Sequence, residues 1–193
     1  MNRKLAFIAT TMLLTFSGLA NSQNEQYAQG LIMDLYIVET EDDAKKPKGR
    51  SVATMVDPTP NTISYLEPVE IAPALKQFRD KPWGLHSQGF LEVETAGPHS
   101  FNVLMSSINN FTCATWIKIQ DRVVTGHGMR NRYNGKFNQY GDVTLRPGIY
   151  AFEAWLGCTD VDRPSKLNLT INMRGPDDAM LKPVPENQLL HKL

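Results

Sequence analysis

The chain has 193 residues, with 20 Lys and Arg against 20 Asp and Glu, so its formal net charge is zero at pH 7. A balanced charge gives no general attraction to nucleic acid or acidic membranes, which argues against both as partners. The length suits one domain that is large enough to bury a core.

The first 22 residues have the three parts of a cleavable secretory signal peptide. Arg3 and Lys4 form a basic head, residues 5–19 are mostly apolar, and small residues end at Ser22. The apolar stretch is interrupted by Thr, Ser and Gly and falls short of the ~20 apolar residues of a spanning helix. No later segment is apolar enough to span a bilayer. We therefore expect a periplasmic or extracellular, cell-surface-associated protein, and the style of the signal favours a bacterial host.

The first part of the mature chain has a mixed character. Residues 31–38 form an apolar run with the composition of a strand, and residues 41–49 combine charges with turn formers, which predicts a solvated loop. Four prolines between Pro58 and Pro73 then divide the chain into short pieces. Only residues 72–79 have the pattern of a helical turn or two.

From residue 83 onwards the hydrophobic pattern has a period of two, which is typical of strands. Few stretches keep helical spacing, so the pattern predicts an all-β protein, with an antiparallel β-sandwich over residues 23–175. The strands are expected at residues 89–94, 100–105, 114–124, 142–146, 149–156 and 166–173.

The two cysteines fit this scheme as a single disulfide, because an exported protein matures in an oxidising compartment. Cys113 opens the predicted strand 114–124, and Cys158 follows the strand 149–156. If these strands are antiparallel neighbours, both cysteines lie at the same end of the sandwich. We predict a Cys113–Cys158 bridge, against the alternative of two buried thiols.

Several short motifs, taken in order, resemble the domain family named after the N-terminal region of anthrax protective antigen. In that family a strand ends in a glycine-containing turn, the next strand begins with an aromatic residue, and a Leu-x-Pro/Ala-Gly-x-Tyr turn leads into a long hydrophobic strand. Here Gly30–Tyr36 matches the first strand of the family. The other matching motifs are Gln88–Val93, Thr95–Phe101, Thr115–Val124 and Leu145–Tyr150.

The resemblance implies a non-catalytic β-sandwich of the kind found in adhesins, toxins and glycosidase inserts, often used to bind carbohydrate. Sugar-binding yeast adhesins of this family hold calcium through two consecutive aspartates on a loop. This chain departs from that pattern, because Asp177 and Asp178 follow the last predicted strand, and a residue separates Asp160 from Asp162. Either acidic pair could add oxygen ligands for calcium or be exposed turn residues, and the exposed turn is the favoured interpretation.

Catalytic motifs are weak in this sequence. The four histidines, His86, His99, His127 and His191, lack the spacing of a paired metal site. Glu92, Glu94 and Glu153 could form a glycosidase carboxylate pair, although carboxylates on a solvent face are the favoured alternative. We expect no enzymatic activity and no cofactor other than this possible calcium.

Residues 126–141 are the strongest candidate for a binding loop, because aromatic rings alternate there with amide and guanidinium donors. The alternative is a long hairpin whose aromatics cover the sandwich. The candidate binding residues are Arg130, Asn131, Arg132, Tyr133 and Asn134.

Residues 176–193 contain three prolines and are expected to extend a sheet only with difficulty. This tail either packs back on the domain or forms an arm for a larger assembly. Two functions remain: an adhesion-type module that recognises carbohydrate or a surface partner, or a structural component of a cell-envelope assembly such as a pilus or conjugative secretion apparatus.

The export signal gives a first testable prediction. Cleavage after Ser22 removes Arg3 and Lys4 and leaves 18 basic against 20 acidic residues, beginning at Gln23. Intact-mass analysis of the protein recovered from the periplasm or medium should show that mature chain. Recovery of the uncleaved chain in the membrane fraction would show that the segment is an anchor.

Overall fold

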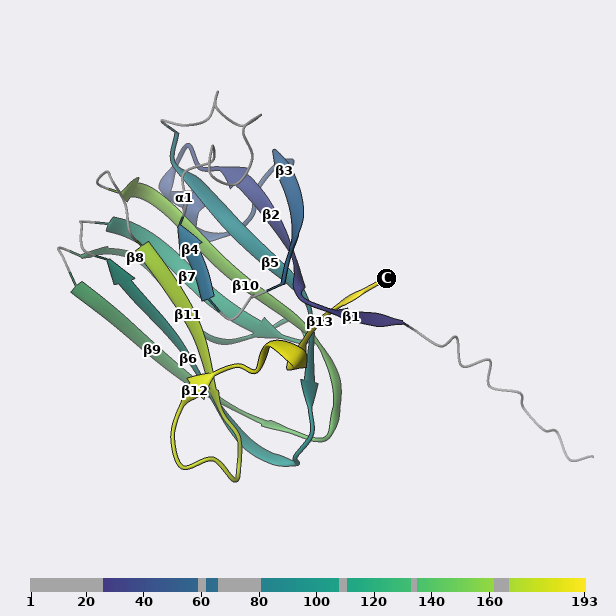
Figure 1. Ribbon diagram of the computed structural model, residues 1–193. Coiled ribbons are helices and arrows are strands. Elements are labelled where there is room, and N and C mark those ends of the chain that lie inside the picture. The colour runs from purple at the N-terminus through teal and green to yellow at the C-terminus, as the bar shows by residue number, and fades with distance from the viewer. Residues whose placement is uncertain (1–25, 59–61, 66–80, 108–110, 133–134, 162–166) are drawn as a thin grey trace, which may run out of the picture.

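The computed structural model describes residues 26–58, 62–65, 81–107, 111–132, 135–161 and 167–193. The predicted signal peptide and the possible helical turn at 72–79 lie outside these ranges. In the described part of the chain, two antiparallel sheets of eight and five strands pack face to face (Figure 1). This confirms the predicted antiparallel β-sandwich.

The eight-stranded sheet is built around one long central strand, β10 (Gly148–Val161). Strands β5 (Trp83–Val93) and β7 (Phe111–Ile119) flank β10, and β8 (Arg122–Arg132) lies beyond β7. On its other side β5 pairs with β2 (Leu31–Ile37) and with β13 (Leu189–Lys192). The short edge strands are β3 (Ala53–Asp57) next to β2 and β1 (Tyr27–Gln29) next to β13.

The five-stranded sheet has β11 (Leu167–Arg174) and β6 (Gly97–Ser107) at its centre. Strand β9 (Gly135–Leu145) pairs with β6, while β4 (Thr62–Tyr65) and β12 (Lys182–Pro183) pair with different parts of β11. The facing sides of the two sheets form one hydrophobic core. Its largest fully buried side chains include Trp83, Phe101, Phe152, Leu91 and Ile117.

Several predicted elements have different boundaries in the structure. The segment 114–124 was predicted as one strand but is two, because β7 and β8 are joined by a tight turn at Gln120 and Asp121. Both turn residues have positive φ, 49° and 61°, as the two central residues of a type I′ turn do. Neither is glycine or asparagine, the residues that most often mark a turn of this type in a sequence.

Strand β5 begins at Trp83 and not at residue 89 as predicted. Residues 83–87 are buried without alternation, because β5 is covered on both faces in this stretch. A strand buried on both sides lacks the period-two pattern on which the sequence analysis depended.

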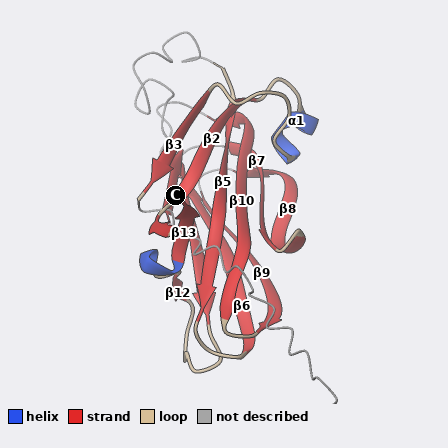
Figure 2. Cartoon of the chain, turned by 90° about the vertical axis from the view of Figure 1, so that its right-hand side faces the viewer, coloured by secondary structure: helices blue, strands red, loops and turns tan. Residues whose placement is uncertain are grey.

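The charged segment 41–49, predicted as a loop, contains the short helix α1 (Glu41–Lys45). Thr40 and Asp43 form a capping box at its N-terminus. The Asp43 carboxylate accepts a hydrogen bond from the Thr40 backbone N–H, and the Thr40 hydroxyl accepts one from the Asp43 backbone N–H. Ion pairs from Lys45 to Asp42 and from Lys48 to Asp43 lower the pKa of both aspartates. The helix lies over the outer face of β10, β7 and β8 (Figure 2). No helix in the described ranges has the length and apolar character needed to cross a membrane.

The C-terminal tail packs back on the domain, which is one of the two alternatives for it. Val184 and Leu189 are fully buried in the core, and β13 extends the eight-stranded sheet. A short 3-10 helix, η2 (Glu186–Gln188), links β12 to β13. The prolines therefore did not prevent the tail from adding a strand, since the segment 189–192 contains none.

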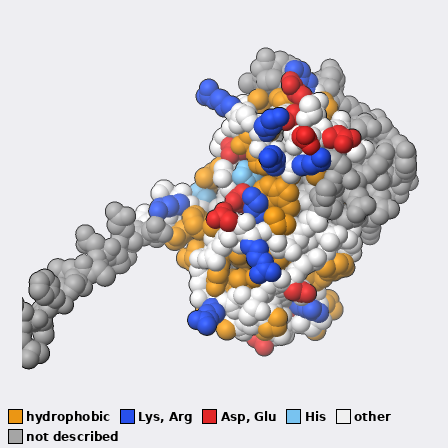
Figure 3. Space-filling model, turned by 180° about the vertical axis from the view of Figure 1, so that it is seen from behind, with side chains coloured by type: hydrophobic (Ala, Val, Ile, Leu, Met, Phe, Trp, Pro, Cys, Tyr) orange, Lys and Arg blue, Asp and Glu red, His pale blue; other side chains and the backbone are white. Residues whose placement is uncertain are grey.

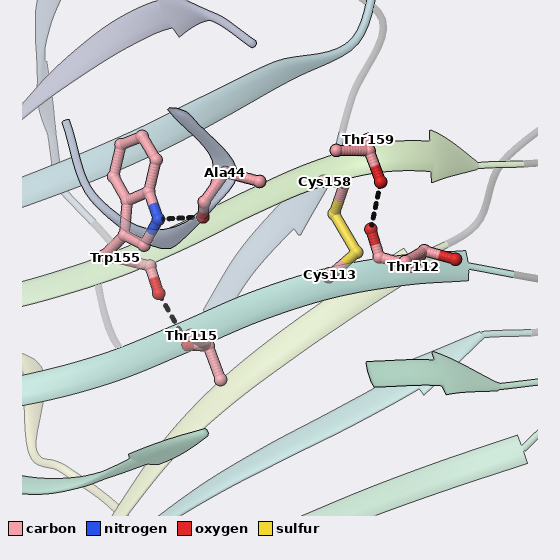
Figure 4. The surroundings of a disulfide bond; sticks show 7 residues. All are labelled: Ala44, Thr112, Cys113, Thr115, Trp155, Cys158 and Thr159. Carbon is pink, nitrogen blue, oxygen red and sulfur yellow. Dashed lines mark hydrogen bonds between the residues drawn. A yellow bond between two sulfur atoms is a disulfide. The ribbon is translucent and has the colours of Figure 1, made fainter. Parts of the chain in front are cut away.

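The predicted disulfide is present between Cys113 and Cys158, which lie directly opposite each other on β7 and β10 (Figure 4). Both cysteines are fully buried. The bridge spans 45 residues, and loop entropy alone makes that worth about 3 to 4 kcal/mol. It fixes the register of the two strands.

Two tryptophans join α1 to the sheet. The Trp155 indole N–H donates to the carbonyl of Ala44 at 2.6 Å, and the Trp116 indole N–H donates to the carbonyl of Lys45 at 3.0 Å (Figure 4 shows the first). These two bonds satisfy carbonyls at the C-terminal end of the helix. Glycines make room for the buried Trp155 ring, since a Cβ on Gly84 would come within 2.4 Å of it.

Replacement of Gly157 by alanine should therefore destabilise the protein. The new Cβ would lie 2.3 Å from the Ala44 carbonyl oxygen and 2.7 Å from the Trp155 ring, so α1 must be displaced. We expect a loss of about 1 to 3 kcal/mol in the free energy of unfolding, measured with urea. Ala151→Ser, an exposed change on the same strand that also adds one atom, is the matched control. Equal effects of the two substitutions would contradict the packing described here.

Candidate functional site

A polar cavity of about 190 Å³ lies at one end of the sandwich, and we call it the end pocket. It is next to the C-terminal end of β5, which pairs with the start of β10, whereas the disulfide lies near the far end of β10. The end pocket is lined by Val93, Glu94, Thr95, His99, Met173, Gly175, Pro176, Asp177, Asp178, Lys182 and Gln188.

Three separate parts of the chain meet here. The turn from β5 to β6 supplies Glu94 and Thr95, the segment after β11 supplies Gly175 to Asp178, and η2 supplies Gln188. The first two parts pack closely, since a Cβ on Gly97 would lie 2.7 Å from the Pro176 ring. Gly97 also has φ 141°, a conformation that favours glycine. The walls are therefore fixed by the ends of strands from both sheets.

His99 forms part of the wall and is only 3% exposed. Its Nδ1 lies 3.0 Å from the carbonyl oxygen of Gly97. A carbonyl can only accept, so Nδ1 carries the proton in the neutral ring and Nε2 is an acceptor. Nε2 lies on the side of Gly175 and has no hydrogen-bond partner among the described residues.

Asp178 holds the segment after β11 in place. One carboxylate oxygen accepts from the Gly175 backbone N–H at 3.0 Å, and the other accepts from the Lys182 ammonium at 2.6 Å. The bond from Lys182, followed by that from the Gly175 N–H, lowers the pKa of Asp178 below its ordinary value of 3.8. The carboxylate therefore stays ionised and ties both ends of the loop together.

Gln188 contributes an unused acceptor. Its Oε1 atom is buried and has no hydrogen-bond partner among the described residues. Buried polar atoms in folded proteins are almost always paired, so such an atom in a cavity wall indicates a site for a donor. Nε2 of His99 is a second acceptor in the wall of the end pocket without a partner among the described residues.

Charges on the exposed surface are mixed in sign. On the face shown in Figure 3, acidic and basic side chains lie among hydrophobic ones and form no large area of one sign. The side chains that line the end pocket have a net negative charge. Asp178 pairs with Lys182, while Glu94 and Asp177 have no ion pair with any described residue. The arrangement suits a neutral or cationic ligand that donates hydrogen bonds.

A second polar cluster lies on the outer face of the eight-stranded sheet. Glu153 on β10 bonds to His86 on β5 at 2.9 Å and lies 3.8 Å from the ammonium of Lys118 on β7. The Lys118 ammonium also lies over the Trp116 ring, and this ring stacks on the ring of Trp155. Because these rings are covered by the protein's own groups, the cluster anchors α1 and offers no open stacking plane.

Of the carboxylates considered as a glycosidase pair, Glu153 does not come close to Glu92 or Glu94. Glu92 lies opposite Ile149 on β10, four residues from Glu153, which is about 13 Å along a strand. That separation exceeds the spacing of paired glycosidase carboxylates. Glu94 lies farther still, beyond the end of β5.

The predicted binding segment 126–141 is not a loop. Residues 122–132 form β8 and residues 135–145 form β9, and these strands belong to different sheets. Arg130, Asn131 and Arg132 are on β8, where Arg130 lies opposite Cys113 and Arg132 opposite Phe111. Tyr133 and Asn134 lie outside the described residues. Arg130, Asn131 and Arg132 are therefore at the disulfide end, away from the end pocket.

Metal ligands do not gather in the described ranges, where no group of three or more His, Cys, Asp and Glu could hold an ion. Asp178 is already bonded to Gly175 and Lys182, and Asp162 lies outside the described residues. Calcium binding stays a prediction from the sequence.

The end pocket cannot be recognised from the sequence, because its residues are far apart in the chain. His99, Asp178, Lys182 and Gln188 come from three segments that show no shared motif. His99 was noted only as a histidine without a paired partner. The one available signal was the pair Asp177 and Asp178 directly after the last predicted strand, where a loop must lie.

Comparison with known proteins supports the fold. No family model and no curated protein matches the sequence. Among solved structures, the PA14 sugar-binding domain from an RTX adhesin is similar, with a TM-score of 0.54, 16% identity, and coverage of 84% of this chain and 98% of that one. The A domain of Epithelial Adhesin 6 from Candida glabrata, solved with Galb1-3GlcNAc, has a TM-score of 0.54, 12% identity, and 89% coverage of each chain.

An anti-sigma factor domain-containing protein from Clostridium clariflavum is similar too, with a TM-score of 0.57, 13% identity and coverage of 84% of this chain. The chain spans about half of that protein, 47% of its length. At these identities the similarity concerns the fold. The chain is a β-sandwich with the fold of PA14 domains, which agrees with the family that its motifs resemble.

The role of Asp178 gives a prediction with a defined pH dependence. Because its pKa is lowered in the folded state, its contribution to stability is complete above the ordinary value of 3.8 and is lost as pH falls through the lowered value. Asp178→Asn should lower the free energy of unfolding at pH 6 and converge with the wild type at strongly acid pH. Urea unfolding at several pH values measures this. Asp177→Asn, which removes an exposed neighbour without an ion pair, should show no such convergence.

Proposed function

We propose that this chain is an exported, non-catalytic binding module that recognises carbohydrate through the end pocket. The observation that carries the proposal is the end pocket itself, a cavity with acceptors on His99 and Gln188 and carboxylates on Glu94 and Asp177. Sugar hydroxyls donate hydrogen bonds to amide, imidazole and carboxylate groups of this kind. Carbohydrate binding therefore uses polar atoms that are otherwise unpaired.

The fold supports the same function. Solved structures with this fold include a domain described as sugar-binding and an adhesin domain in complex with a disaccharide. The separation of Glu92 from Glu153 argues against a glycosidase that uses these two carboxylates. A buried disulfide suits an oxidising, extracellular or periplasmic location, as proposed from the signal peptide.

The site is small for a binding pocket. Its volume of about 190 Å³ is below the ~300 Å³ at which drug-sized ligand sites begin. It has room for one terminal sugar residue with the rest of a glycan outside. We therefore propose recognition of a chain end, as on a cell-surface glycan, and a role in adhesion.

A glycan array probed with the mature protein, with and without calcium, tests the proposal. Gln188→Ala removes an amide side chain from the wall of the pocket and should weaken binding about fivefold or more, a loss of about 1 kcal/mol. Arg130→Ala combined with Arg132→Ala tests the site predicted from the sequence at the disulfide end. Retained folding of each variant is checked by its urea unfolding curve.

The outcomes separate the alternatives. Loss with Gln188→Ala alone supports the end pocket, and loss with the arginine variant alone transfers the site to β8. Binding that requires calcium would contradict a metal-free pocket. No glycan binding, together with co-purification of envelope proteins, would replace this proposal with a structural role in an envelope assembly.

A further inference from the structure

The end pocket has an uneven supply of hydrogen-bonding groups. Lys182 is the only lysine or arginine among the described residues of its lining, and its ammonium is bonded to Asp178 at 2.6 Å. Glu94 and Asp177 are left without an ion pair among the described residues. The net charge at the rim is therefore negative.

The inner wall has the same preference for donors. His99 is 97% buried and presents Nε2 as an acceptor, since Nδ1 is bonded to Gly97. Oε1 of Gln188 is also buried without a partner. A donor on a ligand in the pocket therefore meets an unpaired acceptor in the wall.

We propose, on the basis of the carbohydrate-binding function above, that the end pocket selects sugars bearing a free primary ammonium group, the amino sugars. An ammonium carries three donors and a positive charge, and neighbouring hydroxyls supply further donors. The charge is attracted by Glu94 and Asp177, while a donor reaches Nε2 of His99.

Related sugars fit the pocket less well. N-acetylation removes the positive charge, replaces three donors with one, and adds a carbonyl acceptor and a methyl group to a ligand in a cavity of about 190 Å³. A uronic or sialic acid brings a carboxylate towards Glu94 and Asp177, where like charges repel. Neutral hexoses keep the hydroxyl donors and lack the electrostatic attraction.

The test is isothermal titration of the mature protein with glucosamine, glucose, N-acetylglucosamine and glucuronic acid at low ionic strength. We expect glucosamine to bind about five- to tenfold more tightly than glucose, because two exposed carboxylates each add a modest attraction. N-acetylglucosamine should bind no better than glucose, and glucuronic acid should bind more weakly. Added salt at 0.5 M should remove most of the preference for the amine.

Paired variants identify the source of the preference. Glu94→Gln with Asp177→Asn should make glucosamine and glucose bind about equally, because the amide side chains still accept hydrogen bonds but carry no charge. Glu92→Gln with Glu186→Gln is the matched control, because it removes the same charge from nearby positions that do not line the pocket. An equal loss in both variants would show that overall charge, and not the pocket, sets the preference.

The outcomes also separate this inference from the proposed function. Binding of glucose with no preference for glucosamine overturns the amino-sugar selectivity and leaves carbohydrate binding intact. Absence of binding to all four sugars overturns both. Ethanolamine, an amine without a sugar ring, serves as a further probe; if it binds as tightly as glucosamine, the pocket is an ammonium site and the selectivity for sugars is wrong.

Discussion

The structure depends on the register of β10 between its two neighbours. Strand β10 pairs with β5 over ten residue positions and with β7 along most of its length, and the Cys113–Cys158 bridge holds the second pairing. A shift by one residue would exchange the inner and outer faces of the central strand. The core residue Phe152 would then face outwards and Trp155 would enter the core. One covalent bond thus helps to decide which side chains meet on both faces of the sheet.

The outer face shows what this register achieves. It places Trp155 opposite Trp116 and beside His86, and it brings Glu153 next to Lys118. The two indole rings then reach the last carbonyls of α1, which is only five residues long and could not persist alone in water. The helix is stable because tertiary contacts hold its C-terminal end and a capping box holds its N-terminal end. These contacts hold the segment that connects β2 to β3 against the sheet.

The end pocket illustrates a second consequence of the fold. Antiparallel strands of two sheets end together, so their connecting segments gather at one end and can build a site from distant parts of the chain. Here the C-terminal tail completes the wall, because η2 presents Gln188 while Val184 and Leu189 fix the tail in the core. Strand β13 also pairs with β1, so the N-terminal and C-terminal strands lie side by side (Figure 1). The tail is therefore both a part of the sheet and a part of the proposed site.

The sequence by itself determined the class of fold and the disulfide. Alternation over 149–156 and 166–173 fixed which residues of β10 and β11 face the core, because period two follows directly from strand geometry. The pairing of Cys113 with Cys158 followed from the expected neighbourhood of their strands. Where local signals were absent, the predictions failed: the Gln120–Asp121 turn lacks glycine, β5 is buried on both faces near Trp83, and α1 is held by tryptophans more than seventy residues away. The end pocket depended entirely on the tertiary structure, because its acceptors on His99 and Gln188 become a site only when three segments converge and burial leaves those atoms without partners.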